Sequence, residues 1–124
     1  MMEMLLKNVS PNMRVAQEEV FDPVALVIIA KDDMEGMRLA NDSQYSLGAS
    51  IWTQDLDKAE KLSRMIRYGT VTVNNVVIFD LRVPFGRVKK SGFGRELSRY
   101  GILEFVNIKT VRFYDRLIYQ HHVE

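Results

Sequence analysis

The run PFGRVKKSGFGRE, residues 84–96, combines residue types that could bind a phosphate group. Gly86, Gly92 and Gly94 would let the backbone approach a ligand closely, and basic side chains surround them. A phosphate-binding loop, however, needs a strand that leads directly into the glycines and a helix whose N-terminus faces the anion. The run matches neither common phosphate-loop pattern, and a long loop precedes it. We therefore predict tight turns here, with the basic residues on a solvated face.

Residues that could hold a metal or attack a substrate are scarce. The chain has no cysteine, which excludes disulfides, thiolate metal sites and a cysteine nucleophile within it. Its histidines, His121 and His122, stand among the last four residues, where chain ends usually fray. The sequence therefore predicts no metal site.

The composition is typical of one soluble globular domain. The chain has 124 residues, 47% hydrophobic and 27% charged, with a formal net charge of +1. At this length folding is expected to bury roughly two-thirds of the surface of the extended chain. The low net charge argues against a nucleic-acid partner. We find no signal peptide and no apolar run long enough to span a bilayer, so we predict a cytoplasmic protein with no membrane partner.

Apolar periodicity predicts alternating strands and helices. The expected strands are residues 24–31, 46–53 and 70–74, and the expected helices between them are residues 31–42 and 55–69. Strands that alternate with helices through short loops predict right-handed crossovers. The predicted fold class is therefore α/β, with a βαβαβ parallel sheet in a single domain, residues 1–124.

Terminal residues support both helices. Asp32 is placed to cap the first helix, with Glu35 three residues later completing a capping box. Asp55 is placed to cap the second helix, and Gly69 is expected to close it in a left-handed turn.

The pattern changes after the third strand. Residues 75–94 are expected to form a long loop, and loops of that length in compact domains are usually functional. A short helix is predicted from about Glu96. The alternating segment NIKTVRFYD, residues 107–115, predicts a final strand.

Several separated motifs together resemble one family. The motifs are EEVFDPVALVII, LANDSQYSLGASIWTQDLDKAEKLS, GTVTVN and PFGRVKKSGFGRELSRYG. In order and spacing they resemble the C-terminal part of the aldehyde dehydrogenases, from about Leu5 to Tyr114. The segment GRELSRYGILEFVNIKTV is most similar to the succinate-semialdehyde dehydrogenase branch.

The resemblance implies two cofactor-binding residues. Glu19 and Phe21 match the family positions that contact the nicotinamide ribose and the nicotinamide ring of NAD or NADP. A carboxylate can accept hydrogen bonds from both ribose hydroxyls, and an aromatic edge can hold the ring. Without the resemblance, the residues alone favour another interpretation, in which Glu18 and Glu19 are solvated charges and Phe21 is a core side chain.

The resemblance also implies that the long loop lies on the substrate side. The run at residues 84–96 corresponds to a turn-rich segment beside the substrate entrance. Phe79, Asp80, Arg82 and Phe85 are the candidate residues there. Arg82 could bind the carboxylate of a semialdehyde substrate, whereas Asp80 would repel it.

Two positions depart from the family pattern. Asp22 stands where the family has a glycine after the phenylalanine, and Arg87 stands where it has a second glycine after Gly86. If these positions require a positive φ, aspartate tolerates it moderately and arginine at a cost of about 1 kcal/mol or more.

The family reaction needs groups that have no counterpart in these residues. A cysteine thiolate attacks the aldehyde, a glutamate activates water, and a separate domain binds the dinucleotide. In the family all three lie upstream of the matched segment, so we predict no catalytic residue in this chain, no activity and little cofactor binding by the chain alone. It is then a C-terminal fragment of an enzyme or one chain of a split enzyme, completed by an N-terminal portion. The alternative is a stand-alone oligomerising interaction module with no redox role. The expected partner is a second copy of the chain in a homo-oligomer, with residues 107–115 as the oligomerisation strand, or the missing N-terminal portion.

Overall fold

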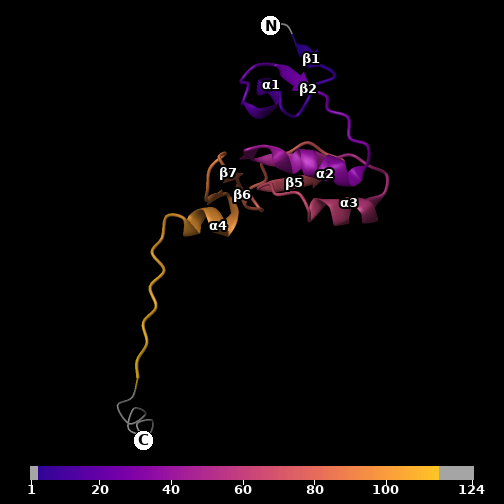
Figure 1. Cartoon of the computed structure of the whole chain (residues 1–124). Helices are drawn as coiled ribbons and strands as arrows, with labels where there is room; N and C mark the ends of the chain where they lie inside the picture. The colour runs from indigo at the N-terminus through magenta and orange to yellow at the C-terminus, as the bar shows by residue number, and fades with distance from the viewer. Residues whose placement is uncertain (1–2, 115–124) are drawn as a thin grey trace, which may run out of the picture.

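The computed structural model describes residues 3–114. Figure 1 shows a small lobe at the N-terminal end, a larger body of helices and short strands, and an extended tail that leads away from the body. The tail therefore begins at the opposite side of the body from the N-terminal lobe. His121, His122 and the last residue of the predicted strand 107–115 lie outside the described residues.

The N-terminal lobe is a parallel pair of strands with one short helix between them. Strand β1 (Met4–Leu6) pairs with β2 (Val24–Leu26), and helix α1 (Arg14–Gln17) lies between them in sequence. Strand β1 was not predicted. The strand expected at residues 24–31 is shorter in the structure, since its pairing with β1 ends at Leu26. One further backbone hydrogen bond follows, from the Val27 N–H to the Leu6 carbonyl over 2.9 Å.

The early end of β2 corrects the prediction of one continuous sheet. Because β2 pairs with β1 in a sheet of its own, it does not extend the strands that follow. Beyond Val27 the chain runs on to the next helix with Ile28 and Ile29 exposed. A continuous apolar run indicates that a segment is suited to burial on both faces, but it does not specify the element that covers it.

Helix α2 (Asp33–Asp42) confirms the predicted cap. The Asp32 carboxylate accepts from the Glu35 N–H over 2.8 Å. The Glu35 carboxylate accepts from the Lys31 N–H over 2.8 Å, one residue before the N-cap that a standard capping box would engage.

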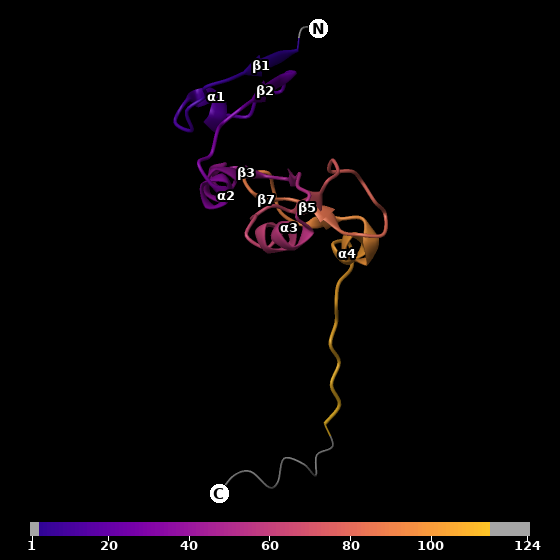
Figure 2. The same cartoon turned by 90° about the vertical axis from the view of Figure 1, so that its right-hand side faces the viewer.

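The body contains the βαβ unit that the sequence predicts best. Strand β4 (Gly48–Ile51) and strand β5 (Thr70–Val73) pair in parallel, and helix α3 (Leu56–Ser63) connects them. The Asp55 carboxylate caps α3 by accepting from the Lys58 N–H over 2.9 Å. This unit confirms the α/β class with parallel strands. Figure 2 shows α2 and α3 end-on beside β5.

The predicted role of Gly69 is wrong. Helix α3 ends at Ser63, and Gly69 has no positive φ. Gly69 is instead a point of close approach, because a Cβ built there would lie 1.9 Å from the carbonyl oxygen of Gly86. The constraint that excludes a side chain at Gly69 comes from a segment far away in the sequence.

The segment predicted as one loop contains two short strands. Strand β6 (Phe85–Gly86) pairs antiparallel with β8 (Arg95–Glu96), and β7 (Val88–Lys89) pairs antiparallel with β3 (Tyr45–Ser46). The predicted strand 46–53 is thus divided between β3 and β4. Pairs of two residues carry little apolar periodicity, which explains why the sequence did not reveal them.

The last described elements are a helix and an extended segment. Helix α4 (Ser98–Leu103) confirms the short helix expected near Glu96. Residues 107–114 form no strand ladder in this chain and are exposed. The oligomerisation role assigned to residues 107–115 therefore stays a prediction.

The buried core is small. Among the described residues, the buried apolar side chains are those of Val9, Ile51, Ala59 and Phe85. The chain exposes 10945 Å², whereas a compact monomer of 14.4 kDa would expose about 6,800 Å². The expectation that two-thirds of the surface would be buried is therefore wrong. The expectation assumed that the chain builds a single compact core of its own.

Candidate functional site

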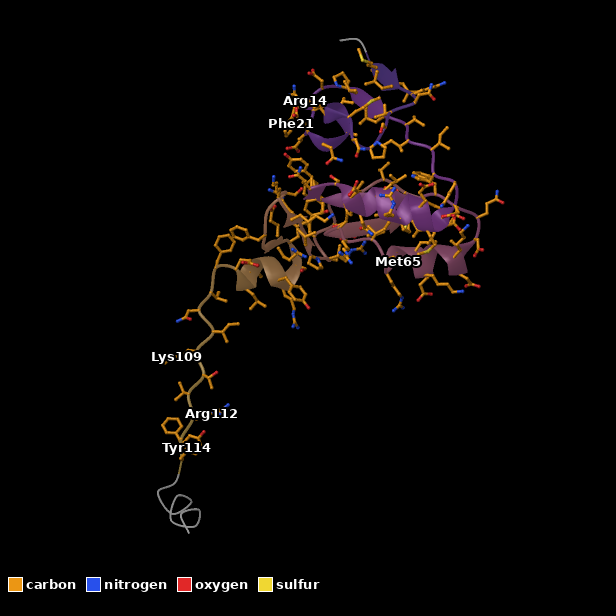
Figure 3. All side chains as sticks on the ribbon, in the orientation of Figure 1. Arg14, Phe21, Met65, Lys109, Arg112 and Tyr114 are labelled. Carbon is orange, nitrogen blue, oxygen red and sulfur yellow. The ribbon has the colours of Figure 1, made fainter. Side chains whose placement is uncertain are left out.

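The cofactor candidates lie on the N-terminal lobe, between α1 and β2. Glu19 and Phe21 are both exposed, and the Phe21 side chain is 90% exposed. Figure 3 shows Phe21 near Arg14 at the edge of the lobe. The residue-based alternative, in which Phe21 is a core side chain, does not hold in this chain.

The structure distinguishes the two adjacent glutamates. Arg14 donates to both carboxylate oxygens of Glu18, from Nε over 2.9 Å and from Nη2 over 3.1 Å. These hydrogen bonds lower the pKa of Glu18. Its carboxylate is therefore already engaged within the lobe, whereas the Glu19 carboxylate makes no hydrogen bond or ion pair with the described residues and is exposed to solvent. Of the pair, Glu19 is the better placed to accept hydrogen bonds from a ligand.

The two aromatic candidates of the substrate-side loop, residues 75–94, are in contact. The rings of Phe79 and Phe85 have centroids 4.4 Å apart and are tilted by 47°. Phe85 is buried because it belongs to β6, while most of Phe79 remains exposed. The buried ring thus supports an exposed apolar surface in the first half of this loop.

The two charged candidates of the same loop bind each other. The Arg82 guanidinium contacts both Asp80 carboxylate oxygens, with the closest pair, Nη2 and Oδ2, 2.6 Å apart. The side-chain and backbone hydrogen bonds from Arg82 lower the pKa of Asp80 to about 2. The Asp80 carboxylate raises the pKa of Arg82 in return. An anionic substrate would have to compete with Asp80 for this guanidinium.

The glycines of the run at residues 84–96 form turns and close contacts. Gly92 and Gly94 have φ values of +126° and +83°, which side-chain-bearing residues rarely adopt. A Cβ on Gly86 would lie 2.5 Å from the Gly94 carbonyl oxygen. The prediction of tight turns is therefore confirmed.

The predicted solvated face of basic residues is only partly correct. Arg95 donates from Nη1 to the carbonyls of Arg87 and Gly94, over 2.9 and 2.7 Å. Lys89 donates from Nζ to two backbone carbonyls in a distant segment. These bonds were not predictable from the sequence, because the residues around a lysine that caps a remote helix do not differ from those around a solvated lysine.

The two departures from the family pattern introduce no left-handed backbone. Neither Asp22 nor Arg87 is among the described residues with a positive φ. The condition under which they would be strained is thus not met. The Arg87 guanidinium lies 3.5 Å from the Glu96 carboxylate, so its charge is paired with a residue of β8.

The cofactor and substrate-side candidates lie on different parts of the chain. Glu19 and Phe21 belong to the N-terminal lobe, whereas residues 79–85 belong to the body (Figure 1). The described residues contain no group of three or more side chains that could hold a metal ion. None of the helices in residues 3–114 is long and apolar enough to cross a membrane.

Comparison with known proteins identifies the family. The family model described as "Aldehyde dehydrogenase family" matches residues 2–111. The chain belongs to the aldehyde dehydrogenase family.

Two curated relatives of this family member share about half of its aligned residues. The succinate semialdehyde dehydrogenase Sad of Escherichia coli, named as using NAD(P)+, is 49% identical over 107 residues, which cover 86% of this chain and 23% of Sad. A probable NADP(+) succinate-semialdehyde dehydrogenase of Synechocystis is 50% identical over 107 residues, which cover 86% of this chain and 24% of the relative. The chain thus spans about a quarter of the length of the curated relatives it matches.

Solved aldehyde dehydrogenase structures match the fold. A Mycobacterium tuberculosis aldehyde dehydrogenase complexed with NAD+ has a TM-score of 0.78 and 40% identity, over 82% of this chain and 21% of that one. The indole-3-acetaldehyde dehydrogenase AldA of P. syringae, in complex with NAD+ and IAA, has a TM-score of 0.81 and 38% identity, over 85% of this chain and 21% of AldA. The arrangement of the lobe and body therefore has counterparts inside larger aldehyde dehydrogenase chains.

Proposed function

We propose that this chain supplies the C-terminal part of an NAD(P)-dependent succinate-semialdehyde dehydrogenase and is inactive alone. The observation that carries the proposal is the identity of 49% and 50% to two succinate-semialdehyde dehydrogenases over 107 residues each. Agreement over that length includes the lobe, the βαβ unit and the substrate-side loop together. A shared fold alone would not require so many common residues.

The contribution of this chain to the cofactor site would come from the N-terminal lobe. The exposed Glu19 carboxylate would accept hydrogen bonds from the ribose hydroxyls, and the exposed Phe21 ring would hold the nicotinamide. Both groups fit this role because neither is buried in the chain. NAD or NADP would supply the hydride acceptor for aldehyde oxidation.

The contribution to the substrate site would come from the substrate-side loop. The exposed face of Phe79, supported by Phe85, would form an apolar wall of the substrate site beside the aldehyde. Arg82 would attract a carboxylate-bearing substrate, with Asp80 setting how readily the guanidinium is released. Because of this competition, the loop would bind an anionic substrate less tightly than a loop with an unpaired arginine.

The nucleophile must come from elsewhere. The chain has no cysteine, and a thiolate is the nucleophile that the family reaction uses. The large exposed surface of the chain supports the same proposal, because the apolar side chains of the lobe and loop would be covered by the remainder of an enzyme.

A second candidate function is a stand-alone oligomerising module. The exposed apolar side chains of residues 105–113 favour it, since an extended segment of this kind can add to the sheet edge of another copy. In that case the chain would assemble without any redox role. A split enzyme, in which a separate chain supplies the cysteine, is a form of the first proposal.

The test replaces the matched 107-residue segment of Escherichia coli Sad with this chain. We expect the chimera to reduce NAD(P)+ with succinate semialdehyde, and the 124-residue chain alone to give no reduction above buffer. In the chimera, Glu19→Gln should raise the KM for the cofactor about tenfold, because charged hydrogen bonds to the ribose are weakened. Glu18→Gln is the matched control and should change that KM less than about twofold, since Arg14 already engages Glu18.

Two outcomes would contradict the proposal. One is a chimera that folds with the same circular dichroism spectrum as Sad yet shows no oxidation. The other is an equal response to Glu18→Gln and Glu19→Gln. A defined homo-oligomer of the chain alone by light scattering, together with an inactive folded chimera, would support the module instead.

A further inference from the structure

Lys89 has an unusual backbone conformation for a lysine. Its φ is +55°, in the left-handed region that residues with a side chain other than asparagine and aspartate rarely adopt. It ends β7, which pairs with β3. A lysine kept in this conformation needs contacts that offset the unfavourable backbone.

The ammonium group of Lys89 caps the C-terminus of α2. Its Nζ donates to the carbonyl oxygens of Asn41 and Ser43, each over 2.8 Å. It also lies 5.6 Å from the centroid of the Tyr68 ring. The last carbonyls of a helix lack partners within it and carry partial negative charge, so a cation there is stabilising, and the aromatic face adds to it.

The capped end of α2 is itself tied to the segment that follows α3. The Asn41 side chain donates from Nδ2 to the Met65 carbonyl over 2.9 Å and accepts from the Arg67 N–H over 2.8 Å. The Tyr68 hydroxyl donates to the Ala40 carbonyl over 2.9 Å. The end of α2 is therefore a fixed point to which Lys89 attaches.

The substrate-side loop is attached in its second half and exposed in its first. After Lys89, the Lys90 N–H donates to the Gln44 carbonyl over 3.0 Å, and Ser91 Oγ accepts from the Ser46 N–H over 2.8 Å. Large apolar side chains between residues 76 and 83 are exposed. The first half is held by Phe79, which packs against Phe85 next to the attached part, and by the Leu81 carbonyl, which accepts from the Ser98 N–H over 3.1 Å.

We propose that Lys89 is a positioning residue that fixes the substrate-side loop to the C-terminus of α2 and thereby sets where Phe79 and Arg82 lie. The attachment itself is a property of the chain. Its consequence for substrate binding rests on the proposed function.

The first experiment measures amide hydrogen exchange in the full 124-residue chain with Lys89→Met and Lys89→Gly. Methionine keeps the length of the side chain without its charge, and glycine fits the positive φ better than lysine does. We expect both variants to lower the protection of the Ser46 and Lys90 amides about tenfold, the effect of losing charged hydrogen bonds. Protection in β5 should stay unchanged. Lys90→Met, which removes a neighbouring charge in the same loop, is the control and should have no such effect.

The second experiment introduces Lys89→Met into the Sad chimera. A displaced loop should raise the KM for succinate semialdehyde severalfold while kcat stays within about twofold, because binding in ground and transition states is weakened alike. A loss of fold would instead lower kcat and the amount of active enzyme together.

The two experiments separate the two proposals. An inactive chimera with the exchange pattern as expected would contradict the proposed function and leave the attachment supported. Absent protection of Ser46 and Lys90 in the unsubstituted chain, unchanged protection in Lys89→Gly, or an equal loss in Lys90→Met would overturn the positioning role. So would an unchanged KM for succinate semialdehyde in an active Lys89→Met chimera.

Discussion

The two parallel strand pairs, β1–β2 and β4–β5, have the same kind of ladder but very different cover. Helix α3 packs on β4–β5 through Ala59, which is 1% exposed, whereas α1 beside β1–β2 contributes no buried residue. The end of β4–β5 is also closed by Asn74, whose side chain donates to the Thr53 carbonyl and accepts from the Thr53 N–H, each over 2.8 Å. Within residues 3–114, no side-chain amide bridges the ends of β1 and β2 in this way.

The difference teaches which part of the chain is locally self-supporting. A ladder of three or four residues contributes little stability by itself, so the stability of a strand pair depends on the side chains that bury its faces. The βαβ unit supplies its own helix for this purpose. The lobe leaves both candidate cofactor residues and much of its apolar surface exposed, as expected of a surface that a larger enzyme would cover.

The largest expected effect comes from Gly69→Ala, one residue before β5. The new Cβ would lie 1.9 Å from a backbone carbonyl oxygen of Gly86, so the backbone of β5 or β6 must move. We expect the free energy of unfolding to fall by about 3 kcal/mol. Urea unfolding followed by the fluorescence of Trp52, the single tryptophan, which directly follows β4, measures it.

Gly36→Ala is the matched control for that substitution. A Cβ at Gly36 in α2 meets only the Ala30 Cβ, at an ordinary 3.7 Å. Alanine should therefore stabilise the helix by about 0.5–1 kcal/mol. A loss below about 1 kcal/mol for Gly69→Ala would contradict the close approach that joins the βαβ unit to β6.

A smaller effect should follow from the caps of the two helices. Asp55→Ala removes the carboxylate that accepts from the Lys58 N–H and should cost about 1 kcal/mol in the Trp52 unfolding signal. Met13 begins α1 without a side-chain cap, so Met13→Asp supplies one. If the lobe is independent of the βαβ unit, Met13→Asp should leave the Trp52 signal unchanged while raising helicity by circular dichroism. A comparable shift of the Trp52 transition by both variants would show that the two regions unfold together.

The smallest effect is the pH dependence of the Arg14–Glu18 pair in the lobe. Because Arg14 lowers the pKa of Glu18 in the folded chain, the pair stabilises α1 above the pKa of an unfolded glutamate. That stabilisation is lost as the pH falls through the folded pKa. A carboxyl titration by NMR should show the pKa of Glu18 rising toward its ordinary value in Arg14→Gln, and high salt should act in the same direction. An unchanged Glu18 titration in Arg14→Gln would mean that the pair does not form in solution.

Local signals in the sequence predicted the elements that are stabilised locally. Helix caps at Asp32 and Asp55 and the alternation from Gly48 to Val73 each depend on neighbours within a few residues or on one crossover. These were confirmed. The family was also correctly predicted, because the order and spacing of separated motifs can be recognised in the sequence without knowing which residues are in contact.

The sequence named candidate site residues but did not predict how their side chains are arranged. The sequence named Asp80 and Arg82 but did not indicate that they form an ion pair with each other. This ion pair leaves the Arg82 guanidinium less available to bind an anion. It named Glu19 without indicating that Arg14 engages the adjacent Glu18. Side-chain pairing depends on rotamers and backbone direction, which residue types in a line do not determine.

The sequence by itself determined the fold class, the starts of α2 and α3, and the family of this chain. Short-range periodicity and capping encode the first two, and the order of separated motifs indicates the third. Only the tertiary structure decided why Gly69 must be glycine, where the Lys89 ammonium group is bound, and that β2 pairs with β1. Each of these depends on a partner segment whose position is set by the packing of the whole chain. Such contacts leave no repeating pattern along the sequence, since their partners are separated by tens of residues.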